Sequence, residues 1–287
     1  MTGQVSSSYT DPAWCEAQYN PRGSVPNATD IYARWPIESA RVKAELPHDA
    51  DIRYGGHARE VMDVFHAVAA QGALVFIHGG YWRGFSKDDF SFLAEALVKA
   101  GISVAMPSYP LCPEVTVNDI AESCRRAITK LLREALSPAE RAKLVICGHS
   151  AGGYLTADLF ATDWRARGLP MTPFHGGLSI SGVFELEPLV NTTMNTAIKL
   201  SVDQARSWSL HEACPHVAAP LVLAVGEKES PEFHRQSLQL AAAWPEICHA
   251  PVRIPGRNHF DVVEELGRAG TPVFAEAMRL FGQGERS

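Results

Sequence analysis

The sequence predicts an α/β fold in which a mostly parallel central sheet is covered by helices on both faces. Short apolar runs, such as residues 73–77 and 221–225, have the length of buried strands. Segments whose apolar residues recur at helical spacing, such as residues 118–135, lie between these runs. Apolar strands that alternate with amphipathic helices are typical of a parallel sheet buried on both sides.

The predicted elements follow one another through the whole chain, and each is identified by its hydrophobic pattern. Strands are expected, in chain order, at residues 51–54, 61–67, 73–77, 102–106, 144–147, 177–180, 221–225 and 252–254. We expect the first two strands to pair with each other. Helices are expected at residues 30–45, 90–100, 118–135, 151–163 and 272–281. Asn118 or Asp119 is expected to cap the third of these helices.

The length favours a single domain over residues 1–287, with two added segments. Residues 1–45 are polar and irregular but contain five Tyr and Trp side chains, which favours an arm packed on the body over a free tail. Residues 184–220 are longer than an ordinary connection between a strand and the next helix. We therefore expect a small cap insertion over the end of the sheet.

Composition excludes several classes of protein. With 46% hydrophobic and 20% charged residues, the chain is neither disordered nor fibrous, and its net charge of −6 carries no basic stripe for nucleic acid. No apolar run approaches the ~20 residues of a membrane span, and the N-terminus lacks a secretory pattern. The six cysteines are scattered without a C-x-x-C pair. These features favour a cytoplasmic protein with a small-molecule substrate, no membrane or nucleic-acid partner, and no metal or cofactor; a homodimer stays open.

A candidate nucleophile lies where a predicted strand meets a predicted helix. Residues 148–152 read Gly-His-Ser-Ala-Gly, the G-x-S-x-G pattern centred on Ser150. The pattern alone is weak, but a strand directly before it and a helix directly after it are typical of a nucleophile elbow. Gly148 and Gly152 omit side chains that would collide at so tight a turn, and the helix N-terminus favours negative charge beside Ser150. The alternative is a serine that only caps the helix.

A glycine-rich loop, His78-Gly-Gly, follows the strand predicted at residues 73–77. Acyl transfer needs N–H donors aimed at the developing alkoxide, and glycines let the main chain approach a ligand. We expect the amides of Gly79, Gly80 and Ala151 to form this oxyanion hole, with an ordinary glycine turn as the alternative. His78 precedes the nucleophile and is expected to brace the loop.

The walls of the substrate pocket are expected to come from the same two segments. Tyr81 and Trp82 follow the glycine loop and are either pocket wall or core. His149 and Tyr154 flank the nucleophile and are expected in the pocket as well.

The base should follow the last strand, because the chain order in this arrangement is Ser, then Asp or Glu, then His. His259 comes after the strand predicted at residues 252–254 and a Pro-Gly turn. None of the competing histidines after Ser150 follows a late strand so directly; they are His175, His211, His216, His234 and His249. The alternative is that His259 is an ordinary histidine of a surface loop.

The acid should follow the preceding strand, at residues 221–225. The loop after it contains Glu227, Glu229 and Glu232 and no aspartate, so the acid would be a glutamate. Its spacing from Gly226 makes Glu229 the best candidate to orient the imidazole. The alternative is a solvated acidic loop.

Several motifs together resemble those of one known family, the kynurenine formamidase (arylformamidase) branch of the α/β-hydrolase esterases. They are H-G-G-Y-W-R at 78–83, G-H-S-A-G-G-Y at 148–154, S-P-E-F at 230–233 with Gln236-Ser237, N-H-F at 258–260, Q-Y-N-P-R at 18–22, Tyr54-Gly55, and Ser181-Gly182 with L-E-P-L at 186–189. The resemblance spans nearly the whole chain.

This resemblance implies the α/β-hydrolase fold and a serine hydrolase for aryl formamides such as N-formylkynurenine, or for short-chain aryl esters. Ser150 would be the nucleophile and His259 the base. The family pattern has aspartate before S-P-E-F, where this chain has Glu229; glutamate takes this role in other α/β-hydrolases. A general carboxylesterase or an amidase of another catabolic pathway is the first alternative. A non-catalytic binding protein is the second, and intact Ser150 and His259 argue against it.

Overall fold

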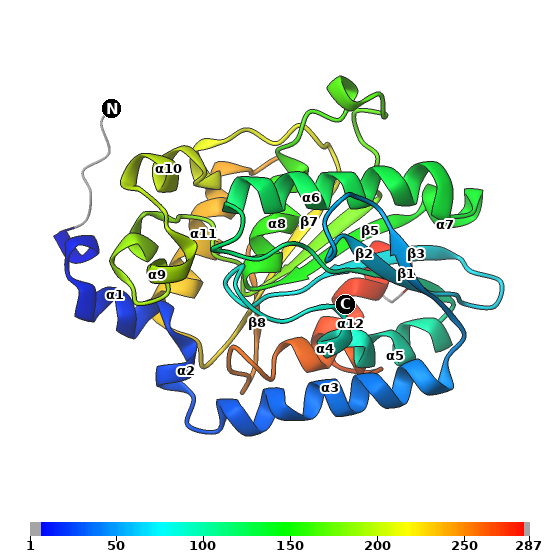
Figure 1. Cartoon of the computed structure of the whole chain (residues 1–287), viewed down its shortest axis with the longest axis horizontal. Helices are drawn as coiled ribbons and strands as arrows, with labels where there is room; N and C mark the ends of the chain where they lie inside the picture. The colour runs from blue at the N-terminus through cyan, green and yellow to red at the C-terminus, as the bar shows by residue number, and fades with distance from the viewer. Residues whose placement is uncertain (1–6, 284–287) are drawn as a thin grey trace.

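One sheet of eight strands runs through the described part of the molecule, and helices cover both of its faces (Figure 1). This architecture comes from a computed structural model that describes residues 7–283. The strands are β1 (His48–Arg53), β2 (Val61–Phe65), β3 (Gly72–Ile77), β4 (Ile102–Pro107), β5 (Leu144–His149), β6 (Gly176–Ile180), β7 (Leu221–Gly226) and β8 (Val252–Ile254). Their order across the sheet is β1-β2-β4-β3-β5-β6-β7-β8.

The direction of the strands confirms the predicted mostly parallel sheet. β1 pairs with β2, as the sequence predicts, and the structure shows that this pair is antiparallel; β2 also pairs antiparallel with β4. All neighbours from β4 to β8 are parallel. The carboxyl ends of six strands therefore meet at one edge of the sheet, where ligands bind in open α/β sheets.

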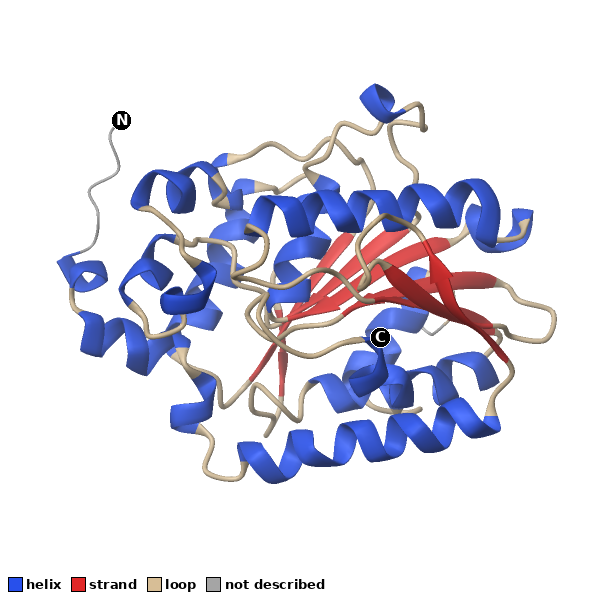
Figure 2. Ribbon diagram, in the orientation of Figure 1, coloured by secondary structure: helices blue, strands red, loops and turns tan. Residues whose placement is uncertain are grey.

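Two layers of helices enclose the sheet, as the ribbon view also shows (Figure 2). The helices are α1 (Pro12–Tyr19), α2 (Pro21–Ser24), α3 (Ala28–Glu45), α4 (Lys87–Phe90), α5 (Ala94–Lys99), α6 (Val117–Lys130), α7 (Pro138–Ala142), α8 (Ala151–Phe160), α9 (Asn195–Ile198), α10 (Val202–Ser207), α11 (Pro231–Ala243) and α12 (Pro272–Leu280). No helix within residues 7–283 has the length and apolarity needed to cross a membrane.

The two hydrophobic cores follow from the alternation of side chains along each strand. In β3, Val75 and Ile77 belong to a core shared with α6, α8 and α11. Their neighbours Leu74 and Phe76 belong to a second core shared with α3, α5 and α12. Because successive strand residues point to opposite faces, a strand buried on both sides has an unbroken apolar sequence.

The helix predicted at residues 90–100 is interrupted in the structure. α4 ends at Phe90, α5 begins at Ala94, and a 3₁₀ turn, Ser91–Leu93, separates them. Within this turn the Phe92 amide donates a hydrogen bond to Ser39 Oγ of α3 (3.1 Å). A tertiary partner thus takes a donor that an uninterrupted helix would bind internally.

The cap of α6 also differs from the prediction. Thr116, rather than Asn118 or Asp119, precedes the helix, and its hydroxyl accepts from the Asp119 amide (3.2 Å). Asp119 reaches back to the Thr116 amide (2.9 Å) and completes a reciprocal capping box. The helix ends five residues before the predicted position, and Leu131–Ala135 continue as a π-helical turn.

The segment expected as an N-terminal arm, residues 1–45, is described from residue 7; residues 1–6 lie outside the described part. It forms a 3₁₀ turn, Ser7–Thr10, followed by α1, α2 and α3. In Figure 1 the blue segment passes around one end of the sheet with α1 and α2 and then runs beneath it as α3.

Buried polar contacts join this arm to distant parts of the chain. Tyr19 Oη donates to Glu232 of α11 (2.5 Å), and Tyr81 Oη donates to the Tyr19 carbonyl. At the other end of the arm, Trp35 Nε1 donates to Glu264 (3.1 Å). All three aromatic side chains are buried, so the arm is part of the core rather than an appendage.

The segment expected as an insertion, residues 184–220, lies between β6 and β7. It contains α9, α10 and the 3₁₀ turns Glu187–Asn191 and Leu210–Glu212. Its buried apolar side chains join the core of α6, α8 and α11; they are Phe184, Leu186, Leu189, Met194, Ile198, Leu200, Ala205 and Leu210. The Thr193 amide donates to Glu16 of the arm (2.8 Å), so the two added segments contact each other.

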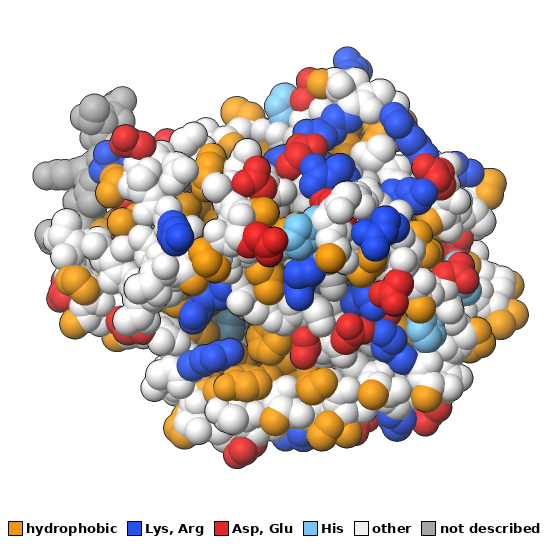
Figure 3. Space-filling view, in the orientation of Figure 1, with side chains coloured by type: hydrophobic (Ala, Val, Ile, Leu, Met, Phe, Trp, Pro, Cys, Tyr) orange, Lys and Arg blue, Asp and Glu red, His pale blue; other side chains and the backbone are white. Residues whose placement is uncertain are grey.

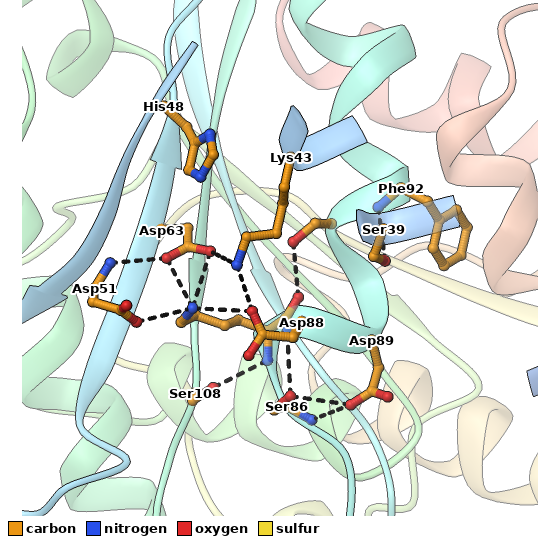
Figure 4. Close-up of polar contacts among 12 residues, drawn as sticks. Ser39, Lys43, His48, Asp51, Asp63, Ser86, Asp88, Asp89, Phe92 and Ser108 are labelled. Atoms are coloured by element: carbon orange, nitrogen blue, oxygen red, sulfur yellow. Dashed lines mark hydrogen bonds and ion pairs between the residues drawn. The ribbon is translucent and has the colours of Figure 1, made fainter. Parts of the chain in front are cut away.

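A buried ionic network fixes the arm to the edge of the sheet (Figure 4). The Asp63 carboxylate of β2 is fully buried between Lys87 Nζ (2.9 Å) and Lys43 Nζ of α3 (2.8 Å). Lys87 also contacts Asp51 and Asp88. Burial alone would raise the pKa of Asp63, but hydrogen bonds from Lys43, the Asp51 amide and Lys87 outweigh it and lower the pKa.

We predict that Lys87→Met lowers the free energy of unfolding by about 3 kcal/mol, because Asp63 would stay buried with one of its two cations missing. Urea denaturation at neutral pH measures this loss. The deficit should shrink in acid: a depressed pKa means that the stability Asp63 contributes is complete above its unfolded pKa of about 4 and is lost as the pH falls through the folded value.

Lys99→Met is the matched control. Lys99 pairs with Glu95 on the surface of α5, where its side chain is 68% exposed, so the expected loss is about 0.5 kcal/mol or less. Equal losses in the two variants would contradict a structural role for the buried network.

Candidate active site

Ser150 occupies a strained turn between β5 and α8. Its φ of +56° and ψ of −118° lie in a region that residues with a Cβ rarely adopt. A Cβ on Gly148 would overlap the Gly152 carbonyl, and a Cβ on Gly152 would overlap the Ile77 carbonyl of β3. Both glycines are therefore required by the close approach of the backbones, and the Ser150 amide is held by the Ile180 carbonyl (2.8 Å).

Three predicted residues form one hydrogen-bonded line. The distance from His259 Nε2 to Ser150 Oγ is 3.1 Å, and from His259 Nδ1 to Glu229 Oε2 it is 2.6 Å. A carboxylate only accepts, so Nδ1 carries the proton and Nε2 is left to accept from the serine hydroxyl. The side chains of His259 and Glu229 are 4% and 0% exposed, which shields the pair from water.

Glu229 is held by further contacts. Its Oε1 accepts from the Gly226 amide (2.7 Å) at the end of β7 and from the Ser181 hydroxyl at the end of β6. The other two glutamates of the loop point elsewhere. Glu227 is exposed, and Glu232 accepts from a tyrosine of the arm.

Ser181 was not among the predicted site residues. Its backbone is also strained, with a φ of +53°, and its amide donates to the Ala224 carbonyl (2.7 Å). The Ser181-Gly182 pair stands among the family-like motifs, but nothing local in the sequence indicates that the hydroxyl reaches a carboxylate 48 positions away.

The three predicted oxyanion donors lie around Ser150. A Cβ on Gly79 would come within 2.8 Å of the His149 carbonyl and 3.1 Å of Ser150 Cβ. Gly80, at a φ of +105°, lines the cavity into which Ser150 opens. Within residues 7–283, the amides of Gly79, Gly80 and Ala151 donate to no protein acceptor. Of the three residues, Gly80 is the one that lines the cavity.

Two further histidines are close to the site without joining the line. His78 Nδ1 contacts the Gly79 carbonyl (2.8 Å), its ring stacks on Tyr109, and burial lowers its pKa to about 3. His149 Nε2 contacts the His259 carbonyl (2.8 Å), and burial lowers its pKa well below the usual value. Both imidazoles are neutral braces of the loops. The competing histidines do not line the cavity: His175, His211, His216, His234 and His249.

A cavity of about 180 Å³ opens beside Ser150. The arm, the glycine loop, the elbow, the insertion and the His259 loop all contribute to it. Its lining residues are Asn20, Pro21, Arg22, Trp35, Gly80, Tyr81, Arg83, Gly84, Phe85, His149, Ser150, Met194, His259 and Phe260.

Two of the four predicted pocket residues line this cavity, and two do not. Tyr81 and His149 are on its wall. Trp82 and Tyr154 are buried in the core, where their rings meet edge to face at 5.4 Å, and Tyr154 Oη donates to the Trp208 carbonyl (2.9 Å). Tyr81 and Trp82 both have positive φ, so strand-like alternation gives no guide to which ring faces the site.

The arm supplies cavity residues that sequence reasoning did not identify: Asn20, Pro21, Arg22 and Trp35. The first three belong to the Q-Y-N-P-R motif, which indicates the family resemblance but not that these residues line the cavity. No group of three or more His, Cys, Asp or Glu residues within residues 7–283 has an arrangement that could hold a metal ion.

Comparison with known proteins finds relatives that agree with this fold. An alpha/beta hydrolase fold family model matches residues 74–234, more than half of the chain. The chain is 28% identical to a kynurenine formamidase of Salmo salar, covering 75% of this chain and 76% of that one. It is 27% identical to a kynurenine formamidase of Danio rerio, covering 88% and 90%.

Solved structures of the same fold are also similar. A presumptive thioesterase from Silicibacter sp. is 30% identical, with a TM-score of 0.81, covering 91% of this chain and 97% of that one. An esterase from Pyrobaculum calidifontis shares the fold at 19% identity, with a TM-score of 0.67 and coverage of 94% and 97%. The chain therefore belongs to the alpha/beta hydrolase fold family, and it is a hydrolase similar to the kynurenine formamidases.

Proposed function

We propose that the protein is a serine hydrolase that cleaves an aryl formamide, of the N-formylkynurenine kind, or a short-chain aryl ester. The observation that carries this proposal is the hydrogen-bonded line from Glu229 through His259 to Ser150, which opens onto a cavity beside free amide donors. The relatives named kynurenine formamidase support the formamide.

The first half of the reaction forms an acyl-enzyme. Ser150 Oγ attacks the substrate carbonyl while His259 Nε2, 3.1 Å away, takes its proton. Glu229 stabilises the imidazolium that results and keeps the imidazole in the tautomer that can accept. The amides of Gly79, Gly80 and Ala151 receive the negative charge that develops on the carbonyl oxygen.

The second half releases the products. His259 gives its proton to the leaving amine or alcohol, and the acyl group stays on Ser150. Water then attacks the acyl-enzyme with His259 again as the base, and the acid leaves. The proposed reaction steps use no metal and no organic cofactor.

The cavity supports a small acyl group and a flat leaving group. At about 180 Å³ it is smaller than the ~300 Å³ at which drug-sized pockets begin. Tyr81, Phe85, Phe260 and Trp35 give it aromatic walls, which favour a planar aromatic ring. A carboxylesterase or an amidase of another pathway could use the same cavity. A purely binding role would not require the hydrogen bonds that join Glu229, His259 and Ser150.

We predict that Ser150→Ala lowers kcat by at least ~10³-fold and abolishes labelling by a fluorophosphonate, because the covalent route disappears. Unchanged circular dichroism would show that the fold persists. Turnover near the wild-type rate in a clean preparation would rule out this mechanism.

Glu229→Gln should lower kcat by about 10³- to 10⁴-fold, since the imidazole loses its charged partner and its fixed tautomer. Glu227→Gln is the matched control: this glutamate is exposed and accepts from the Gly256 amide (2.8 Å) rather than from His259, so less than about a twofold change is expected. If Glu227→Gln were the more damaging change, another carboxylate would be the acid.

Acyl length provides the test of substrate class. Across aryl formamides and aryl esters from formyl and acetyl to octanoyl, kcat/KM should fall with length, because each methylene that does not fit costs about 1–3 kcal/mol. Aryl leaving groups should be preferred to alkyl ones. A preference for octanoyl over acetyl would favour a lipase-like enzyme, and equal rates at all lengths would favour an unselective esterase.

A further inference from the structure

Two arginines give the cavity beside Ser150 a positive charge. Arg22 comes from α2 of the arm and Arg83 from the loop after the glycine pair, and both line the cavity. Its lining contains no Asp or Glu among the described residues. The chain as a whole carries a net charge of −6, so this local excess of positive charge runs against the overall balance. In the space-filling view, basic side chains border a hollow above α3 (Figure 3).

Neither guanidinium is paired directly with a carboxylate of the described residues. Within residues 7–283, the side chains of Arg22 and Arg83 form no hydrogen bond or ion pair; Arg22 lies over the Tyr32 ring at 5.0 Å. Arg83 also helps to lower the pKa of Glu16, but the Glu16 carboxylate accepts hydrogen bonds from Asn20 Nδ2 (2.6 Å) and the Thr193 amide (2.8 Å) rather than from the guanidinium. Both arginines thus keep their donors available.

Their setting differs from that of the arginines that stabilise the fold. Arg235, for example, binds Glu185 and Glu232 at 2.6 and 2.8 Å. Arg257 binds Glu265 at 2.6 Å. A guanidinium is always charged, and its fork of N–H groups matches the two oxygens of a carboxylate. Two such groups on one small concave surface raise the local concentration of anions.

We propose that Arg22 and Arg83 bind a carboxylate of the substrate, outside the bond that is cleaved, and so select anionic acyl compounds over neutral ones. This inference rests on the proposed hydrolysis at Ser150. The carboxylate could stand on the leaving group or on the acyl group; the chemistry of recognition is the same, and the two sources are separated by experiment.

The experiment compares kcat/KM for matched pairs that differ only in charge. The leaving-group pair is 3-acetoxyphenylacetate and 3-acetoxyphenylacetamide, and the acyl-group pair is monophenyl succinate and phenyl succinamate. In the wild type, at least one acid should exceed its amide by about tenfold, as for a hydrogen bond to a charged group. Arg22→Gln and Arg83→Gln should each bring that ratio toward one, and raising the salt concentration should reduce it in the wild type.

Arg165→Gln is the matched control, because it removes the same charge from an exposed turn away from the cavity and should keep the wild-type ratio. A ratio near one for both pairs in the wild type, or ratios that the Arg22 and Arg83 variants leave unchanged, would overturn the proposal.

A binding measurement separates this inference from the proposed reaction. By calorimetry, at least one of two product acids should bind the wild type about tenfold more tightly than its amide, and Arg83→Gln should remove the difference. The leaving-group pair is 3-hydroxyphenylacetate and 3-hydroxyphenylacetamide, and the acyl-group pair is succinate and succinamate. This result needs no turnover: preference for the acid without hydrolysis of any ester would refute the reaction but not the arginine site. Equal affinity for acid and amide in both pairs would refute the site.

Discussion

Beneath Ser150 two backbones come so close that no side chain fits between them, and the rest of the site depends on this contact. Gly152 lies against the end of β3, while Gly79 lies against the His149 carbonyl and the Ser150 side chain. The elbow and the glycine loop therefore form one block rather than two loops that must find each other. In the proposed reaction, the nucleophile and the amide donors must keep a fixed relative position, and this backbone packing supplies it.

The proposed acid and base reach this block from two later strands of the sheet. Glu229 follows β7 and His259 follows β8, and parallel register brings both to the edge where β5 ends. A glutamate has one more rotatable bond than an aspartate, so its carboxylate has more conformational freedom to lose when it binds the imidazole. The Gly226 amide and the Ser181 hydroxyl both hold its other oxygen and restrict that freedom.

Local patterns predicted most of the sheet and the positions of Ser150, His259 and Glu229, because a strand, its end and the residue after it lie within a few positions of one another. The outcomes that differ depend on contacts between distant segments. The helix predicted at residues 90–100 is interrupted where Ser39 of α3 accepts a hydrogen bond from the Phe92 amide. The orientation of Trp82 depends on a backbone with positive φ, and no periodic pattern describes such a loop. Arg22 belongs to a cavity whose other walls lie far along the chain.

The arm imposes an order on assembly. It leaves the ribosome before the surfaces it packs against, since the Tyr19 hydroxyl binds Glu232, 213 positions later, and Trp35 binds Glu264. Before Glu232 has been added to the chain, the cavity that Asn20, Arg22 and Trp35 line still lacks His259, which has not been made. Long-range closures of this kind are slow and come late in folding. The backbone contacts of the Ser150 elbow reach no later in the chain than Ile180, whereas the enclosed cavity needs every lining residue from Asn20 to Phe260.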